Sequence, residues 1–319
     1  MIAGILRLIR WKNILIIAFT QYCIRYLLIN GMLKFMNLGI ILQLSNFNFF
    51  LLSFSTLCIA SAGYIINDYF DTRIDTFNKP NKVVVGKSIS RRQAMLLHTV
   101  INIIGVALGF YVGYRVGLIK LGFIHLLSTG LLWFYSTDFK KQLLIGNIVI
   151  AFLTAMVPMI VVLYELPVLV SKYKTIMLYS GLNFNHILLF VTTYAGFAFL
   201  TSLIREIVKD MEDHFGDRQF GCKTIPIVLG ISPTKKIVYA LVVVEMLLLL
   251  LVQIKQLASL DLTSVIYFGI CFQTSFSILL YQIKKADNPS DYHKASRTLK
   301  VIMLLGVVYS ALYYYLLLY

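Results

Sequence analysis

Long uncharged hydrophobic stretches alternate with short polar segments along most of this chain. A helix of about 20 apolar residues crosses the hydrocarbon core of a bilayer, and a helix satisfies its own backbone hydrogen bonds in lipid. We therefore predict an all-α protein, a polytopic membrane bundle of nine transmembrane helices that forms a single domain over residues 1–319. The predicted spans are about residues 13–32, 47–67, 93–114, 117–136, 142–164, 186–206, 237–255, 262–282 and 297–318. Arg25 interrupts the first of them.

The composition agrees with a membrane protein, since 59% of the 319 residues are hydrophobic and only 13% are charged. Soluble domains average about 45–50% apolar and about 25% charged residues. The net charge of +15 would also suit a nucleic-acid-binding protein, but the positions of the basic residues argue against that class. With the spans above, 22 Lys and Arg residues fall on one side of the membrane and six on the other. By the positive-inside rule, we expect an integral protein of the inner or plasma membrane whose basic side faces the cytoplasm.

The acidic residues are as one-sided as the basic ones. Eleven of the fourteen Asp and Glu residues lie in the predicted cytoplasmic segments. Two groups of three share an i, i+3, i+7 spacing, and the second group follows the first by 142 residues. They are Asp68, Asp71 and Asp75 after the second span, and Asp210, Asp213 and Asp217 after the sixth. Residues at this spacing share one helix face, so each group predicts an acidic stripe that extends from the C-terminal end of a span.

Such a stripe is unfavourable unless a cation balances its charge. The C-terminal end of a helix already carries partial negative charge, and like charges one turn apart repel each other. Carboxylates, waters and substrate phosphates are the ligands that Mg²⁺ commonly takes in proteins. The stripes therefore predict Mg²⁺ sites. The alternative is a pair of solvated helix ends whose acids are neutralised by Arg73, Lys209 or Arg218.

At these positions the chain resembles a known family. The run NDYFDTRID at residues 67–75 is similar to the N-D-x-x-D-x-x-x-D signature of the UbiA superfamily of intramembrane prenyltransferases. The run DHFGD at residues 213–217, with GCKT at 221–224, resembles the second motif of that superfamily, D-x-x-x-D. The resemblance covers nearly the whole chain. It implies nine helices around a central cavity, with both motifs on the cytoplasmic side.

The resemblance also implies a role for each matching residue. The oxygen ligands implied for Mg²⁺ that bridges a prenyl diphosphate are Asn67, Asp68, Asp71, Asp75, Asp210, Asp213 and Asp217. The implied catalytic residues are Asp71, Asp75, Asp213 and Asp217. The cations implied to bind the diphosphate are Arg10, Lys82, Lys140, Lys209 and Lys223. Residues 10–13, RWKN, are similar to the R-P-x-N start of the family, and residues 135–140 resemble its Y-x-x-x-K element with the Lys one position later.

The implied activity is the Mg²⁺-dependent transfer of a prenyl group from a polyprenyl diphosphate, geranylgeranyl diphosphate in particular, to a lipid acceptor. Within the superfamily, the motifs look most like those of the enzymes that add a second geranylgeranyl chain to a prenylglycerol phosphate. Enzymes of that group have Arg at the position of Lys82. Lysine keeps the positive charge but lacks the two parallel N–H donors with which Arg binds phosphate. Prenylation of an aromatic quinone precursor is therefore the second hypothesis for the reaction.

A membrane transporter is the alternative of another class, because acids inside membrane spans mark ion paths. Of the fourteen acids, only Glu245 lies well inside a predicted span, and both acidic stripes lie at one face. The location of the acids favours the enzyme.

Overall fold

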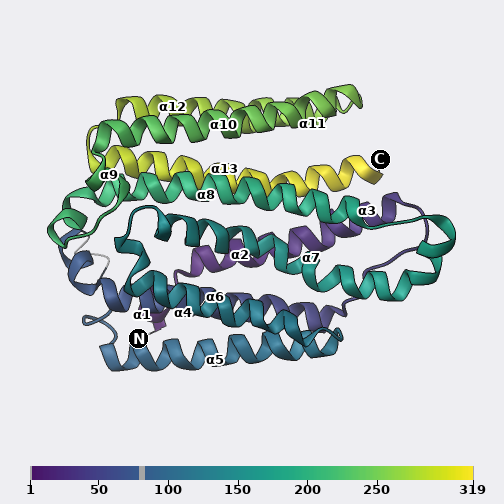
Figure 1. Ribbon diagram of the computed structural model, residues 1–319, viewed down its shortest axis with the longest axis horizontal. Coiled ribbons are helices and arrows are strands. Elements are labelled where there is room, and N and C mark those ends of the chain that lie inside the picture. Colours follow the sequence, from purple (N-terminus) through teal and green to yellow (C-terminus); the bar gives the residue numbers. More distant parts are fainter. Residues whose placement is uncertain (1, 79–82, 319) are drawn as a thin grey trace. The chain divides into compact units, whose positions relative to one another are not determined.

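The structure, a computed structural model, describes residues 2–78 and 83–318 and is built from helices (Figure 1). The described residues contain no β-strand, and one isolated bridge joins Val85 to Ile89. The α-helices are α1 (Ile2–Leu8), α2 (Trp11–Cys23), α3 (Asn30–Phe35), α4 (Asn46–Asn78), α5 (Arg91–Arg115), α6 (Gly122–Thr137), α7 (Ile145–Ser180), α8 (Asn185–Gln219), α9 (Ile225–Val228), α10 (Ile231–Ala258), α11 (Leu262–Tyr267), α12 (Thr274–Lys285) and α13 (Pro289–Leu318). Shorter turns between them are the π-helical η1 (Ile24–Ile29) and η4 (Phe268–Gln273) and the 3-10 η2 (Ile119–Leu121) and η3 (Phe139–Lys141).

Eight helical segments of the described residues are long and apolar enough to cross a membrane. They begin at Trp11, Asn46, Arg91, Ile145, Asn185, Ile231, Leu262 and Pro289. The other predicted span, residues 117–136, corresponds to η2 and α6, and α6 has only 16 residues. α6 begins later than the predicted span because Gly117 has a φ of 76°, and a right-handed helix cannot continue through a residue with a positive φ. The prediction of an all-α membrane bundle is confirmed, whereas the count of nine spans is not.

Two helices continue well beyond the membrane spans predicted for them. α4 has 33 residues and α8 has 35, although the predicted spans ended at residues 67 and 206. No proline interrupts either helix, so each continues through the polar residues that follow its span. Both acidic stripes are therefore helical, as their spacing predicted.

The chain forms two compact units. The first comprises residues 1–139, 156–195 and 317–319, and the second comprises residues 140–155 and 196–316. In the first unit, α4, α5 and α6 pack against one another, and a large apolar cluster joins η1, the start of α4, and parts of α7 and α8. In the second unit, α10 packs against α11 and α12.

Arg25, which interrupts the first predicted span, is buried in the π-helical turn η1 and is only 1% exposed. Its Nε donates a hydrogen bond to Oε2 of Glu165 at 3.2 Å. Its two Nη atoms donate to the side chain of Asn46 and to the carbonyl of Leu44. Oε1 of Glu165 in turn accepts the backbone N–H groups of Gln43 and Leu44, at 2.5 and 3.0 Å. The charge inside the span is thus paired and hydrogen-bonded, which is the condition for burying it.

The position of Glu165 shows that the prediction of Glu245 as the one acid well inside a span was wrong. α7 continues to Ser180 although Pro158 and Pro167 lie within it, so it extends far beyond the predicted end at residue 164. Glu165 is therefore inside the helix and fully buried. Because Arg25 and two backbone donors satisfy it, we interpret this acid as part of the fold and not as part of an ion path.

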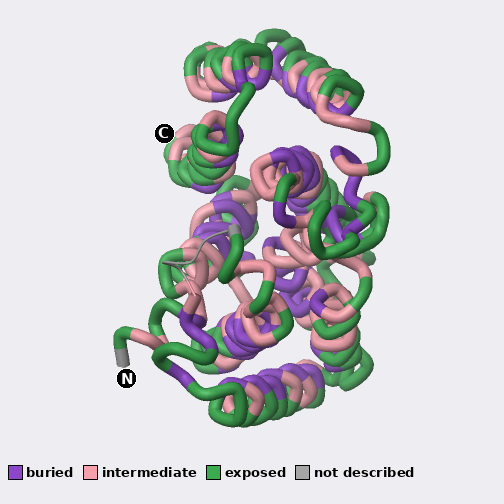
Figure 2. Tube along the Cα trace, turned by 90° about the vertical axis from the view of Figure 1, so that its left-hand side faces the viewer, coloured by how far each residue is buried: buried purple, intermediate pink, exposed green. Residues whose placement is uncertain are grey.

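Many helices have one buried side and one exposed side (Figure 2). In α5, for example, Ala94, His98 and Asn102 are buried at steps of four residues. On the opposite side, Leu96 and Ile103 are 61% and 64% exposed. In a helix that crosses a membrane, such exposed apolar side chains face lipid, because lipid tails are as apolar as the protein core.

Candidate active site

The first candidate site lies on the C-terminal part of α4, in the first unit. We call its polar residues the first cluster: Asn67, Asp68, Asp71 and Asp75. All of them are half-buried, whereas Arg73, Thr76 and Phe77 of the same helix are exposed. The helix therefore places the first cluster on its more sheltered side, as expected for residues that share one face.

Arg10 forms an ion pair with the first cluster. Its Nη2 donates to Oδ1 of Asp68 at 2.9 Å, and its guanidinium lies 4.9 Å from the centre of the Tyr64 ring. Arg10 joins α1 to α2 with a φ of 52°, a left-handed conformation that costs a residue with a Cβ about 1 kcal/mol. Burial lowers the pKa of Arg10, but the Asp68 carboxylate together with Tyr64 and Tyr135 outweighs burial, so the pKa lies above its ordinary value. The structure thus brings a cation predicted to bind diphosphate to the cluster predicted to bind metal.

Asn67 has a buried side-chain oxygen, Oδ1, to which the described residues offer no donor. Leaving a buried polar atom unpaired costs about 1–3 kcal/mol, so such atoms usually have a partner in the working protein. Amide and carboxylate oxygens are ligands of hard cations such as Mg²⁺. The first cluster therefore fits Mg²⁺, both by the chemistry of its donors and by this one unsatisfied oxygen.

The segment after the first cluster folds back onto α1 and α4. Val85 and Ile89 are buried and pack with Leu8 of α1 and Ile65 of α4. This apolar contact holds the segment beside the cytoplasmic end predicted for α4. Lys82, which was predicted to bind the diphosphate, lies outside the described residues.

The second candidate site lies on the C-terminal part of α8, in the second unit. We call its acids the second cluster: Asp210, Asp213 and Asp217. All three are half-buried, while Phe215 and Arg218 beside them are exposed. Oδ2 of Asp210 accepts a hydrogen bond at 2.8 Å from Nδ2 of Asn147, a buried residue near the start of α7. Sequence analysis missed Asn147, whose only signal is one amide within an apolar run.

Two basic residues share one carboxylate just before the second cluster. Nζ of Lys209 donates to Oε2 of Glu206 at 2.8 Å, and Nη1 of Arg205 donates to Oε1 at 3.1 Å. Glu206 is only 6% exposed, so both ion pairs are partly shielded from solvent. Lys209, predicted to bind the diphosphate, directly precedes Asp210 of the second cluster, and its ammonium group donates to Glu206. The alternative interpretation expected Lys209 to pair with an acid of the stripe, whereas the carboxylate that it pairs with, Glu206, lies outside the stripe.

The last two predicted diphosphate ligands, Lys140 and Lys223, lie on neighbouring segments of the second unit. The backbone N–H of Lys223 donates to the carbonyl of Lys141 at 2.7 Å. Gly221, with a φ of 71°, makes the turn that brings the chain back after α8. The loop after the second cluster is thus anchored to η3. Lys223 is exposed and Lys140 is half-buried.

A further contact that sequence analysis missed connects the second cluster's helix to α13. Oε1 of Glu212 and Nδ1 of His293 lie 3.1 Å apart. Glu212 directly precedes Asp213, and the pair links segments 81 residues apart. No spacing in the sequence identifies such a partner, because it depends on which helices pack together.

Within the described residues, no three His, Cys, Asp or Glu side chains come together in a group that would hold a metal ion. Helix geometry explains this within each cluster, because residues i and i+7 are roughly 10 Å apart along the axis. One ion therefore contacts only part of a stripe. The metal-binding, catalytic and diphosphate-binding roles of these residues remain predictions, as does the central cavity.

Comparisons with known proteins agree with the motifs. The sequence profile of the UbiA prenyltransferase family matches residues 39–305. The digeranylgeranylglyceryl phosphate synthase of Methanosphaera stadtmanae is 28% identical over 265 residues, which cover 82% of this chain and 86% of that protein. The protein of the same name from Methanothermobacter thermautotrophicus is 33% identical over 186 residues, 58% of this chain and 57% of its own length.

Solved structures share the fold. One of a digeranylgeranylglyceryl phosphate synthase in membranes aligns with a TM-score of 0.61 at 23% identity, over 98% of this chain and 97% of that chain. One of a UbiA homologue from Archaeoglobus fulgidus bound to DMAPP and Mg²⁺ aligns with a TM-score of 0.57 at 16% identity, over 97% and 99%. At these identities the alignments are evidence for the fold of the chain, an intramembrane helical bundle.

Proposed function

The chain belongs to the UbiA prenyltransferase family and is an integral membrane prenyltransferase, and from this premise we propose its substrates and its metal. We propose that it transfers a geranylgeranyl group from geranylgeranyl diphosphate to a prenylglycerol phosphate, and that the transfer requires Mg²⁺. The names of its relatives support this acceptor, and the homologue that binds DMAPP and Mg²⁺ supports the type of donor and the metal.

The observation that carries the proposal is the arrangement of the first cluster on α4. A row of half-buried carboxylates lies beside Oδ1 of Asn67, an amide oxygen to which no described residue donates a hydrogen bond. We assign Mg²⁺ binding to Asn67, Asp71, Asp75, Asp213 and Asp217. Asp68 and Asp210 were also expected as ligands, but they accept hydrogen bonds from Arg10 and Asn147. We therefore assign these two acids to positioning.

The proposed reaction is a substitution at the first carbon of the prenyl chain. The oxygen of the acceptor hydroxyl forms a bond to this carbon, the bond from the carbon to the diphosphate oxygen breaks, and the hydroxyl proton passes to water or to the released diphosphate. Mg²⁺, when bound, supplies charge stabilisation to the departing diphosphate. The cationic side chains assigned to the same task are Arg10, Lys82, Lys140, Lys209 and Lys223. Positive charge that is already in place stabilises developing negative charge most strongly where water is excluded.

The proposal is tested by incubating the purified protein in detergent with labelled geranylgeranyl diphosphate and a choice of acceptors. Geranylgeranylglycerol phosphate should be prenylated in the presence of Mg²⁺, and EDTA should abolish the reaction. 4-Hydroxybenzoate should remain unmodified. Prenylation of the aromatic acid alone would overturn the acceptor and favour the quinone-precursor alternative. Equal rates with Mg²⁺ and with EDTA would overturn the role of the metal.

We also propose that both clusters face the cytoplasm, since the basic segments beside them follow the positive-inside rule. Single cysteines that replace the exposed residues Lys87 and Ser232 should be labelled from the cytoplasmic side of membrane vesicles by an impermeant maleimide. A cysteine at the exposed Lys172 should be labelled from the opposite side. The unmodified chain is the control for its native cysteines. Labelling of positions 87 and 232 from opposite sides would contradict a shared face.

A further inference from the structure

A groove opens in the first unit at the N-terminal end of α5, and Tyr69 of α4 forms part of its lining. It has a volume of about 620 Å³. Its lining residues are Tyr69, Arg91, Arg92, Met95, Leu96, Thr99 and Val100. Two guanidinium groups thus stand at one end of the groove, and mostly apolar side chains continue from them along the helix.

Both arginines are exposed, and within the described residues neither forms an ion pair with a carboxylate. The guanidinium of Arg91 lies over the ring of Tyr69, 4.3 Å from its centre, which fixes the side chain at the wall of the groove. A guanidinium stacked in this way keeps its N–H donors in the plane available for an anion. Phosphate is one of the anions whose geometry the guanidinium group matches with two parallel N–H donors.

The start of α5 itself is already capped. Oγ of Ser90 accepts the backbone N–H of Gln93 at 3.2 Å, and Oε1 of Gln93 accepts the N–H of Ser90 at 3.0 Å. This capping box satisfies two of the N–H groups that a bare helix terminus would offer to an anion. The two arginines, and not the helix terminus, therefore supply the positive charge of the groove.

The apolar part of the groove lies along the exposed side of α5. Leu96 and Val100 are 61% and 46% exposed, and Ile103 continues the same side of α5 at 64%. From Arg92 to Ile103 the helix rises roughly 16 Å. That distance matches half of the ~30 Å hydrocarbon core, which is the depth of one leaflet. A charged end and an apolar wall one leaflet long fit an amphiphile and not a small anion.

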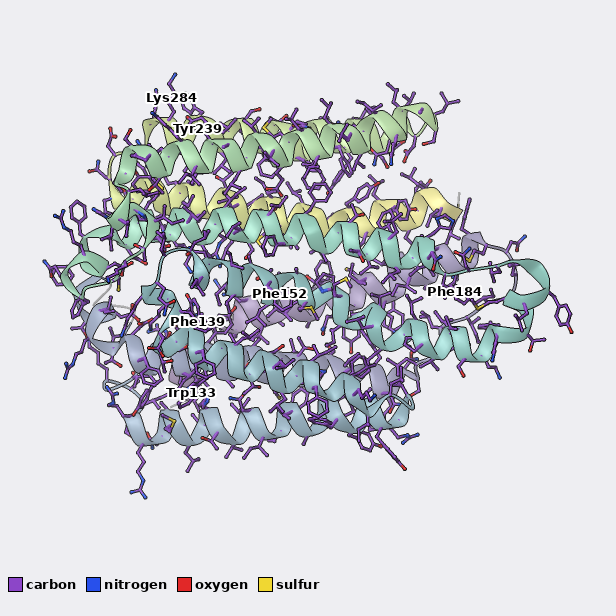
Figure 3. All side chains as sticks on the ribbon, viewed as in Figure 1. Trp133, Phe139, Phe152, Phe184, Tyr239 and Lys284 are labelled. Atoms are coloured by element: carbon purple, nitrogen blue, oxygen red, sulfur yellow. The ribbon has the colours of Figure 1, made fainter. Side chains whose placement is uncertain are left out.

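We propose that this groove binds an anionic phospholipid of the surrounding membrane, with its phosphate at Arg91 and Arg92 and one chain along Met95 to Val100. The lipid is distinct from the prenyl substrates of the proposed function. Trp133 of α6 (labelled in Figure 3) supports the inner side of this region, since it contacts Phe70 of α4 and His98 of α5. The wall of the groove on the side of α4 and α5 is therefore already formed before a lipid binds.

The test measures lipid binding directly, by native mass spectrometry of the full chain titrated with phosphatidylglycerol or phosphatidylcholine, without Mg²⁺ or prenyl substrate. The parent protein should bind phosphatidylglycerol more tightly. Arg91→Gln/Arg92→Gln should weaken that binding roughly twenty-five-fold, about fivefold for each arginine. Val100→Trp, which fills the apolar part without changing charge, should also weaken it. The matched control Lys284→Gln/Lys285→Gln removes the same charge at the end of α12 and should leave binding unchanged.

Three results would overturn the proposal. One is equal binding of the two lipids by the parent protein. A second is an equal loss in the Arg variant and the Lys control, which would mean that any surface charge suffices. The third is full displacement of the lipid by inorganic phosphate together with no effect of Val100→Trp, which would mean that the groove holds a small anion only. None of these measurements depends on prenyl transfer, so they fail or succeed independently of the proposed function.

Discussion

Replacing Asp71 by Asn is expected to slow prenyl transfer by roughly a hundredfold to a thousandfold while the protein still inserts and folds. The substitution keeps the size of the side chain and removes one negative charge from the half-buried face of α4. If Asp71 is a metal ligand, the loss falls on the step in which the diphosphate departs. Asp217→Asn on α8 should have an effect of the same size. Asp287→Asn, whose side chain is 86% exposed, is the matched control and should retain full activity.

The same variants should reveal whether the two clusters serve one diphosphate. Calorimetry of the parent protein should show tight binding of geranylgeranyl diphosphate with Mg²⁺ and very weak binding with EDTA, because the binding of metal and diphosphate is reciprocal. Asp71→Asn and Asp217→Asn should lose similar amounts of the metal-dependent affinity. With EDTA the variants should bind slightly better than the parent, since less negative charge repels the ligand. Near-normal turnover in either variant, or an affinity loss confined to one cluster, would contradict the proposal that residues of both clusters bind the metal.

Removing one partner of the buried pair Arg25 and Glu165 is expected to lower the free energy of unfolding by about 3–5 kcal/mol. Arg25→Met leaves the Glu165 carboxylate buried without its counter-ion. Glu165→Gln likewise leaves the Arg25 guanidinium buried without a counter-ion. The double variant should lose much less than the sum, because neither charge is then left unpaired. Titration of the detergent-solubilised protein with SDS, followed by circular dichroism, measures all three losses.

Catalytic activity distinguishes this structural role from a functional one. The double variant should retain prenyl transfer at a temperature where it is folded, since neither residue belongs to a cluster. A double variant that loses as much stability as the two single variants together would show that the residues act independently.

The helical type and the polarity of the spans follow from local sequence, and so does the continuation of two of them into the acidic stripes. Apolar runs predict helices in lipid because the backbone has no other way to satisfy its hydrogen bonds there. The i, i+3, i+7 spacing predicts a common face because the helix has a fixed pitch. The late start of α6 was not predicted. Gly117, which interrupts the helix, lies next to an apolar run, and the prediction followed the hydropathy of that run.

The sequence by itself therefore determined the membrane class, the helical stripes and the family motifs of this protein. Only the tertiary structure decided which partner each polar side chain has: Asp68 with Arg10, 58 residues away, Asp210 with Asn147, 63 residues away, and Arg25 with Glu165, 140 residues away. Hydropathy and helical periodicity are properties of neighbouring residues, so they are present in any short window of the chain. A buried charge or amide is stabilised by whichever distant segment packs beside it, and that depends on how the helices fit together in three dimensions.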